Sequence, residues 1–142
     1  MEAKDICVSF ETAKALQDAG VVVESYFSWA KAWDWGSNIS DWRIETMMDV
    51  VRYSMVYQIE YLPAPTAEEL YSYLPKFTTI DDKFYRLRMY INNDNLLQVY
   101  YQYYPDREYL GDIIATHLRP CEAFAKLVIR VKEAGYELQR KS

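Results

Sequence analysis

The residues best suited to chemistry in this sequence are one histidine, His117, and two cysteines, Cys7 and Cys121. A catalytic histidine needs a nucleophile or an orienting carboxylate beside it, and the sequence pattern places neither next to His117. Zinc sites need several histidine or cysteine ligands, and one histidine with two distant cysteines does not supply them. We therefore interpret His117 as a structural or surface residue and both cysteines as small buried hydrophobic residues.

Carboxylates cluster at three places: Glu68 and Glu69, Asp81 and Asp82, and Asp106 and Glu108. Neighbours on a helix point about 100° apart, so Glu68 and Glu69 make a poor catalytic pair. The other two clusters fall in predicted loops, where solvated acids are more common than ligands of a cation. The sequence has no P-loop, no Rossmann fingerprint and no G-x-S-x-G. We predict no catalytic residue, no metal site and no cofactor.

Another group of residues is suited to binding. Alternation along a predicted hairpin puts four side chains on one face, the candidate interaction surface: Arg86, Arg88, Tyr90 and Tyr100. Proteins that bind single-stranded nucleic acid stack bases on exposed aromatics beside arginine. Arginine beside tyrosine is also ordinary cross-strand packing. Because the net charge of the chain is −5, we favour a protein partner over nucleic acid.

Composition indicates one folded domain. The chain has 142 residues, of which 51% are hydrophobic and 16% aromatic, which is too apolar for a disordered chain. Charge is uneven: residues 1–82 hold 14 acids and 6 bases (−8), and residues 83–142 hold 7 acids and 10 bases (+3). The two halves are expected to pack together and partly neutralise each other.

Targeting signals are not evident in the sequence. The start, MEAKDICVSF, lacks the basic and apolar regions of a signal peptide. Apolar runs fall far short of the ~20 residues that span a membrane. We expect a cytoplasmic protein with reduced thiols and no membrane partner.

The first third of the chain predicts a helix followed by a hairpin. In VSFETAKALQDAG, Ser9 is a suitable N-cap and Gly20 a suitable stop. In SYFSWAKAWDW, aromatic residues alternate on one face (Phe27, Trp29, Trp33 and Trp35), and the turn-rich GSNISD and the alternating WRIET complete a hairpin. A DNA-binding helix-turn-helix is excluded, because β-branched and aromatic residues follow the first helix.

Residues 42–51 fit either a strand or a helix, and both alternatives stay open. The next segment, RYSMVYQIEYL over residues 52–62, alternates Tyr53, Met55, Tyr57, Ile59 and Tyr61 with polar side chains. Period two over this length predicts a strand with one buried face.

The segment YLPAPTAEELYSYLP predicts a strand end followed by a capped helix. Pro63 and Pro65 cannot donate ladder hydrogen bonds. Thr66 and Glu69 have the spacing of a capping box, and Pro75 ends the helix. This interpretation predicts that Thr66→Ala costs about 1 kcal/mol and that Glu69→Gln costs less.

The second hairpin, KFYRLRMYINNDNLLQVYYQYY, has a predictable register. Its apolar residues share a face if Ile91 pairs with Leu97 and Met89 with Val99, which leaves residues 93–95 as the loop. The third loop position must be left-handed, and asparagine tolerates that conformation.

RPCEAFAKLVIRVKEAG predicts the last helix, with Pro120 in the first turn and Gly135 after its end. Its buried stripe is Cys121, Phe124, Leu127, Val128 and Val131, and its exposed stripe is Glu122, Lys126, Arg130 and Glu133.

Three segments together resemble a group of small uncharacterised proteins encoded by bacteria and their phages: VSFETAKALQDAG, PAPTAEELYSYLP and EAFAKLVIRVKEAGY. The resemblance covers about a third of the chain, mostly its helices. It carries no known activity or site residue. It implies an accessory protein of a phage or mobile element more than a metabolic enzyme.

The elements predict a single α+β domain over residues 1–142. One antiparallel sheet of about five strands is expected to carry three helices, in the order α-β-β-β-α-β-β-α. The leading functional hypothesis is a non-enzymatic binding or accessory module that could self-associate. The alternatives are an acidic inhibitor or immunity-type protein, whose carboxylates would come from residues 34–69, and a small enzyme that uses His117.

Overall fold

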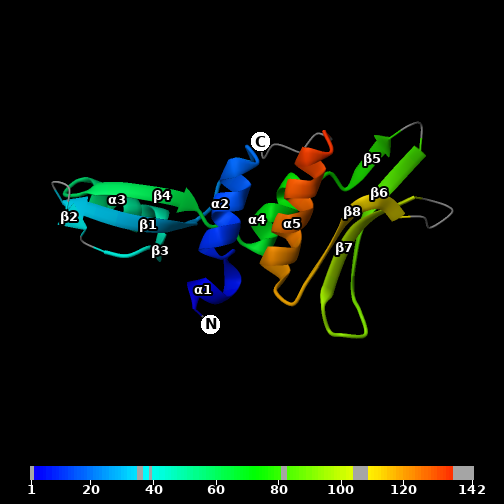
Figure 1. The fold of residues 1–142 in the computed structure, drawn as a ribbon, viewed down its shortest axis with the longest axis horizontal. Helices are drawn as coiled ribbons and strands as arrows, with labels where there is room; N and C mark the ends of the chain where they lie inside the picture. The colour runs from blue at the N-terminus through cyan, green and yellow to red at the C-terminus, as the bar shows by residue number, and fades with distance from the viewer. Residues whose placement is uncertain (1, 35–36, 39, 81–82, 104–108, 136–142) are drawn as a thin grey trace.

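The computed structural model describes residues 2–34, 37–38, 40–80, 83–103 and 109–135. Its described part is an α+β fold with two antiparallel sheets and five helices. Figure 1 shows the β1–β4 sheet and the β5–β8 sheet at opposite ends of an elongated molecule, with α1, α2, α4 and α5 between them. We call these the first sheet and the second sheet.

The first sheet is built around β1 (Phe27–Asp34). On one side β1 pairs with β2 (Ser37–Asn38) and β3 (Arg43–Thr46), and on the other with β4 (Gln58–Pro63), all antiparallel. Trp29 lies opposite Ile44 in β3. The predicted hairpin between the tryptophan-rich segment and WRIET is therefore confirmed, whereas Trp35 lies outside the described residues.

The predicted strand over residues 52–62 is wrong in its first half. Helix α3 (Met47–Ser54) begins at Thr46, whose Oγ1 accepts a hydrogen bond from the Asp49 N–H (3.2 Å), and β4 starts only at Gln58. The helical alternative for the end of residues 42–51 is the correct one. Alternating tyrosines suggested a strand, but the N-cap determines the local structure because it satisfies a free N–H at the helix start.

Alanine and serine, rather than tryptophan, form the more buried face of β1. Ser28, Ala30 and Ala32 are buried, whereas Phe27, Trp29 and Trp33 are half-buried. The Ser28 hydroxyl lies 2.9 Å from Met47 Sδ at the start of α3. Small side chains allow α3 to pack closely on this face, so each face of β1 contacts part of the protein.

The second sheet has the order β5-β6-β7-β8. Its central pair, β6 (Lys83–Ile91) and β7 (Leu97–Tyr103), has the predicted register, with Ile91 opposite Leu97. Asn95 has the left-handed φ of 61° that the three-residue loop requires. The hairpin prediction is confirmed to the residue.

Both outer strands of the second sheet were missed. Strand β5 (Phe77–Ile80) is short, and β8 (Tyr109–His117) begins in a segment that we expected to be a loop. The expected single sheet of about five strands with three helices is therefore corrected, for the described residues, to two four-stranded sheets with five helices. The loop acids Asp81, Asp82, Asp106 and Glu108 lie outside the described residues.

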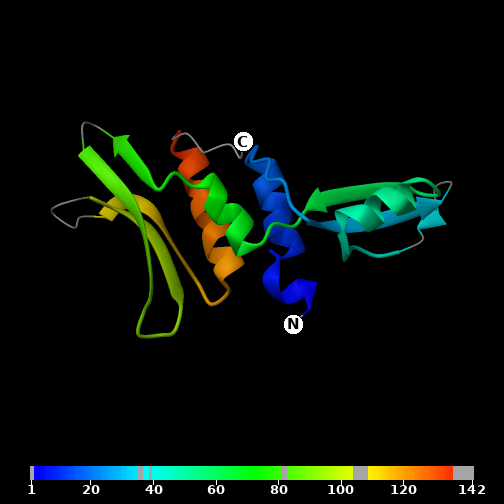
Figure 2. The same cartoon turned by 180° about the vertical axis from the view of Figure 1, so that it is seen from behind.

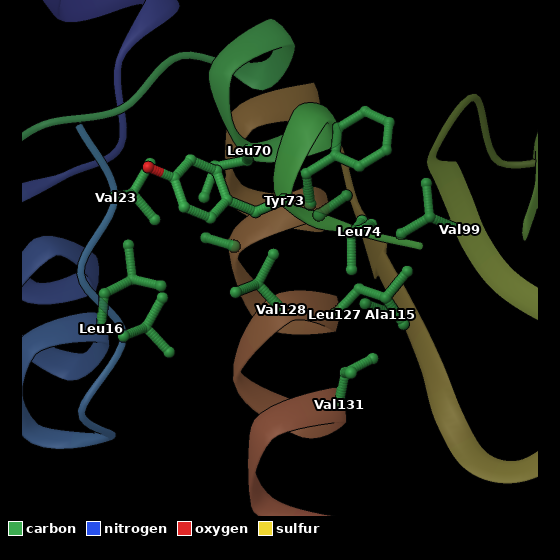
Figure 3. Packing of buried hydrophobic residues seen from close by; sticks show 14 of the residues in the cluster. Leu16, Val23, Leu70, Tyr73, Leu74, Val99, Ala115, Leu127, Val128 and Val131 are labelled. Atoms are coloured by element: carbon green, nitrogen blue, oxygen red, sulfur yellow. The ribbon is translucent and has the colours of Figure 1, made fainter. Parts of the chain in front are cut away.

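The core lies around α5 (Pro120–Glu133), which Figure 3 shows with side chains packed on both sides of it. Leu16 of α2 (Phe10–Asp18) and Val23 approach from one side, and Val99 and Ala115 of the second sheet from the other. The predicted buried stripe of α5 is confirmed, as is Gly135 with a φ of +83° after the helix. Helix α4 (Ala67–Tyr73) adds Leu70, Tyr73 and Leu74.

Glu122 was predicted on the exposed stripe of α5, and this prediction is wrong. It is 5% exposed, and its carboxylate accepts hydrogen bonds from the Ser9 N–H (2.8 Å) and the Thr12 hydroxyl. Arg119 lies 3.8 Å from it and donates to the carbonyls of Lys4, in α1 (Ala3–Ile6), and Cys7, both at 2.7 Å. The N-terminal helices are therefore joined to α5 by a charged pair and its hydrogen bonds.

Glu69 performs a similar role on α4. The predicted capping box is present: Thr66 Oγ1 accepts from the Glu69 N–H (3.3 Å), and Glu69 Oε1 accepts from the Thr66 N–H (2.9 Å). The same carboxylate also accepts from the Ser25 hydroxyl (2.8 Å) and the Tyr26 N–H (2.9 Å). Because Ser25 and Tyr26 lead directly into β1, Glu69 joins α4 to the first sheet. Figures 1 and 2 show α4 beside α5, between the two sheets.

These bonds reverse the expected ranking of substitutions. Glutamine has one acceptor oxygen and a donor NH₂, so Glu69→Gln leaves a backbone N–H of Tyr26 or Thr66 without its acceptor. We expect Glu69→Gln to cost about 1–3 kcal/mol, at least as much as the ~1 kcal/mol of Thr66→Ala. Urea melts of both variants, with the exposed Glu68→Ala as control at a few tenths of a kcal/mol, measure the order. A Glu69→Gln variant as stable as wild type would contradict the role of Glu69 in attaching α4 to the first sheet.

Candidate functional site

The candidate interaction surface lies on the side of the second sheet that faces away from the helices. Tyr85, Val99, Tyr101 and Ala115 belong to the buried core with α5. Strand alternation therefore turns the other side chains outward. We call these the outer face: Phe77, Thr79, Phe84, Arg86, Arg88, Tyr90, Gln98, Tyr100, Gln102, Ile114 and Thr116.

The four predicted surface residues share this face but differ in exposure. Arg88 and Tyr90 are exposed and Arg86 is half-buried. Tyr100 is only 7% exposed, so its predicted place on the surface is wrong. The Tyr90 ring packs edge-on against the Tyr100 ring, with centroids 6.2 Å apart, and helps to cover it. Tyr100 therefore packs beneath Tyr90, and of the two tyrosines Tyr90 is the one accessible to a partner.

Two phenylalanines extend the surface, and the sequence analysis missed them. Phe77 of β5 is 60% exposed and Phe84 of β6 is 47% exposed. Their rings stack at 15° with centroids 5.3 Å apart. Phe84 could have been found, because it alternates with Arg86 and Arg88 along the predicted hairpin. Phe77 could not, because it lies in β5, which was not predicted. Exposed stacked aromatics beside arginine have the composition of protein interfaces.

The outer face carries positive charge on an acidic protein. Arg86 and Arg88 lie on it, and none of its described side chains is a carboxylate. Arg88 forms no ion pair or hydrogen bond with another described residue. Arg88 is therefore an exposed cation on this face that an acidic group of a partner can meet, on a chain of net charge −5.

His117 has a structural position at the turn into α5. Its Nδ1 accepts a hydrogen bond from the Arg119 N–H (2.9 Å), which holds the turn between β8 and the helix. Within the described part of the chain, no carboxylate or thiol forms a hydrogen bond or ion pair with it. The arrangement that a histidine-based mechanism would need is not formed by these residues.

Four of the seven acids of residues 34–69 have a partner or an opposite base nearby. Glu45 pairs with Arg43 (2.6 Å) and Asp49 with Arg52 (3.9 Å), while Glu69 caps α4. Glu60 lies opposite Lys31 across β4 and β1. Three of these acids are thus paired or placed opposite bases within the first sheet and α3, which weakens the acidic-inhibitor alternative.

Both cysteines are buried, as expected. Burial raises the pKa of the Cys7 thiol from 9.0 to about 12, with smaller contributions from Glu69 and Cys121. Burial also raises the pKa of Cys121. Because the thiolate is the nucleophile, both thiols are poorly suited to catalysis. Among the described residues, no three His, Cys, Asp or Glu side chains gather to hold a metal ion.

A cavity of about 480 Å³ opens where α1, α4 and α5 meet. Its lining residues are Asp5, Ile6, Thr66, Ala67, Glu68, Pro120 and Cys121. Asp5 accepts from the Glu2 N–H as part of the cap of α1, and Glu68 lies in the first turn of α4. Both carboxylates therefore have structural positions at helix starts, where the helix dipole favours them.

Comparisons with known proteins find no relative of this chain. No protein-family model, curated protein sequence or solved structure matches it. None of the helices in the described residues is long and apolar enough to cross a membrane. Function is therefore inferred from the residues and geometry of this chain alone.

The buried thiols generate a direct test. We expect the native protein at pH 8 to react with a thiol-specific disulfide reagent orders of magnitude more slowly than the unfolded chain, because thiolate is scarce at a raised pKa and access is blocked. Raising the pH toward 12, as far as the protein stays folded, should accelerate the reaction because the thiolate fraction of Cys7 increases. The absorbance of the thiolate that the reagent releases measures the rates for the native and the unfolded protein. Rapid native labelling of either cysteine would contradict the burial.

Proposed function

We propose that this chain is a non-enzymatic protein-binding module, and that its interface is the outer face of the second sheet. The observation that carries the proposal is the exposed Phe77–Phe84 stack beside Arg88 and Tyr90 on a face without a described carboxylate. Aromatic residues and arginine are the types enriched at protein interfaces. The partner surface is therefore acidic and partly apolar.

The alternatives have less support. An enzyme would need a partner for His117 or a reactive thiol, and His117 accepts a backbone N–H while both thiols are buried. An acidic inhibitor would need a free carboxylate patch, and Glu45 and Asp49 are paired with arginines. An accessory module agrees with the resemblance of the helical segments to small bacterial and phage proteins.

A site-specific crosslink tests this proposal. A photo-reactive phenylalanine analogue at Tyr90, on the outer face, is compared with one at Val22, which is exposed in the segment before β1. In an extract of the native host, we expect one reproducible protein adduct at position 90 and none at position 22. Arg88→Glu should reduce the adduct severalfold, because it reverses the charge that attracts an acidic partner.

Two results would contradict the proposal. Equal adducts at positions 90 and 22 would show non-specific capture. A nuclease-sensitive adduct at position 90 would show that the face binds nucleic acid, which also stacks on aromatic side chains beside arginine.

A further inference from the structure

The free edge of β5 lies next to the proposed interface. Among the described strands, β5 pairs only with β6, so it is an edge of the second sheet. Edge strands present unpaired backbone groups that another extended segment can pair with. Which groups β5 presents follows from its register with β6.

The register turns the backbone of Phe77 and Thr79 outward. The Leu87 N–H donates to the Lys76 carbonyl (2.8 Å), so residues 76 and 87 form a hydrogen-bonded pair. In an antiparallel ladder such pairs alternate with non-hydrogen-bonded ones. Phe77 opposite Arg86, and Thr79 opposite Phe84, are therefore non-hydrogen-bonded pairs. Their N–H and C=O groups point away from β6, which leaves two donors and two acceptors along the free edge.

Side chains on the same residues continue the outer face. Phe77 and Thr79 turn their side chains to the side that carries Phe84 and Arg86. A segment paired with β5 would therefore place every second side chain on the outer face, with one of them beside the exposed Phe77 ring. Main-chain bonds would supply affinity, and the phenylalanine stack with the arginines would select side chains.

Charge decides between the two available occupants. Pairing of β5 with β5 of a second copy would bring the arginines of both copies onto one continuous face without a described carboxylate. A segment with glutamate or aspartate at alternate positions would instead place negative charge toward Arg88.

We propose that β5 accepts an extended segment of an acidic partner protein as a fifth strand of the second sheet. Its apolar side chains lie against Phe77, and its carboxylates lie toward Arg88. This inference rests on the proposed function and adds the binding mode and the chemistry of the partner. The same face without strand pairing would bind a folded acidic surface, and the two modes differ in whether they use the outward N–H and C=O groups of Phe77 and Thr79.

The variant pair Thr79→Pro and Thr79→Ala separates these modes. Proline removes the outward N–H of residue 79, which makes no bond to β6, so an edge strand can accommodate it. Alanine keeps that N–H and, like proline, lacks the threonine hydroxyl, so the two variants differ at the backbone donor. Circular dichroism and melting temperature verify that both variants stay folded. If Thr79→Pro unfolds, Phe77→Pro tests the other outward N–H with Phe77→Ala as its control.

The probe is a short labelled peptide of alternating glutamate and valine with a central phenylalanine, and the same peptide with lysine in place of glutamate is the control. By fluorescence anisotropy, we expect the glutamate peptide to bind at least about tenfold more tightly than the lysine peptide, a difference of about 1.4 kcal/mol. Thr79→Pro and Arg88→Glu should each weaken binding by a similar factor, and Thr79→Ala should not.

Other outcomes would overturn the strand-addition inference. Binding lost in Arg88→Glu but kept in Thr79→Pro would show that the face binds without strand pairing, and the proposed function would stand. If neither peptide binds but the crosslink at position 90 is still present, strand addition is likewise overturned and the proposed function stands. A wild-type dimer in sedimentation that Thr79→Pro dissociates would assign the edge to a second copy.

Discussion

The arrangement of this protein depends on the carboxylate of Glu69. One side chain on α4 accepts hydrogen bonds from the Thr66 N–H, the Ser25 hydroxyl and the Tyr26 N–H, which belong to segments 40 residues apart in sequence. Without this acceptor, the Thr66 N–H and the Ser25 hydroxyl would be unsatisfied at a half-buried joint, which is costly. Helix start and sheet attachment therefore depend on the same group: the Thr66–Glu69 cap is local to α4, and the bonds from Ser25 and Tyr26 attach the start of β1 to it.

Glu122 repeats this solution at α5, where it accepts from Ser9 and Thr12 of the N-terminal segment. Two carboxylates thus attach the N-terminal half to the helices that carry the second sheet. The helical layer covers only the inner side of that sheet, through Val99, Tyr101 and Ala115. Its outer face and the edge of β5 remain accessible in the described structure, which is why binding is the function that the geometry favours.

Local rules predicted the parts that are determined locally. The capping box, the left-handed Asn95 and the register of Ile91 with Leu97 each follow from a few neighbouring residues. The sequence failed where distant groups decide. Glu122 is buried because Ser9, 113 residues away, donates to it, and nothing in its own helix indicates this. The strand prediction at Tyr53 and Met55 failed for a local reason: Thr46 caps α3, Tyr53 lies in that helix, and Met55 is its C-cap. The outer face was half predicted: Arg88 and Tyr90 were found, but Phe77 required the unpredicted strand β5.

Amide hydrogen exchange, residue by residue, tests most directly whether one carboxylate joins α4 to the first sheet. In wild type, the amides of Thr66 and Tyr26 should be protected, because both donate to Glu69. In Glu69→Ala, which removes both acceptor oxygens, we expect protection at these amides to fall together, while the core amide of Val99 in the second sheet keeps its protection. Unchanged protection of Tyr26 in Glu69→Ala would contradict the account, because β1 would then be held without Glu69.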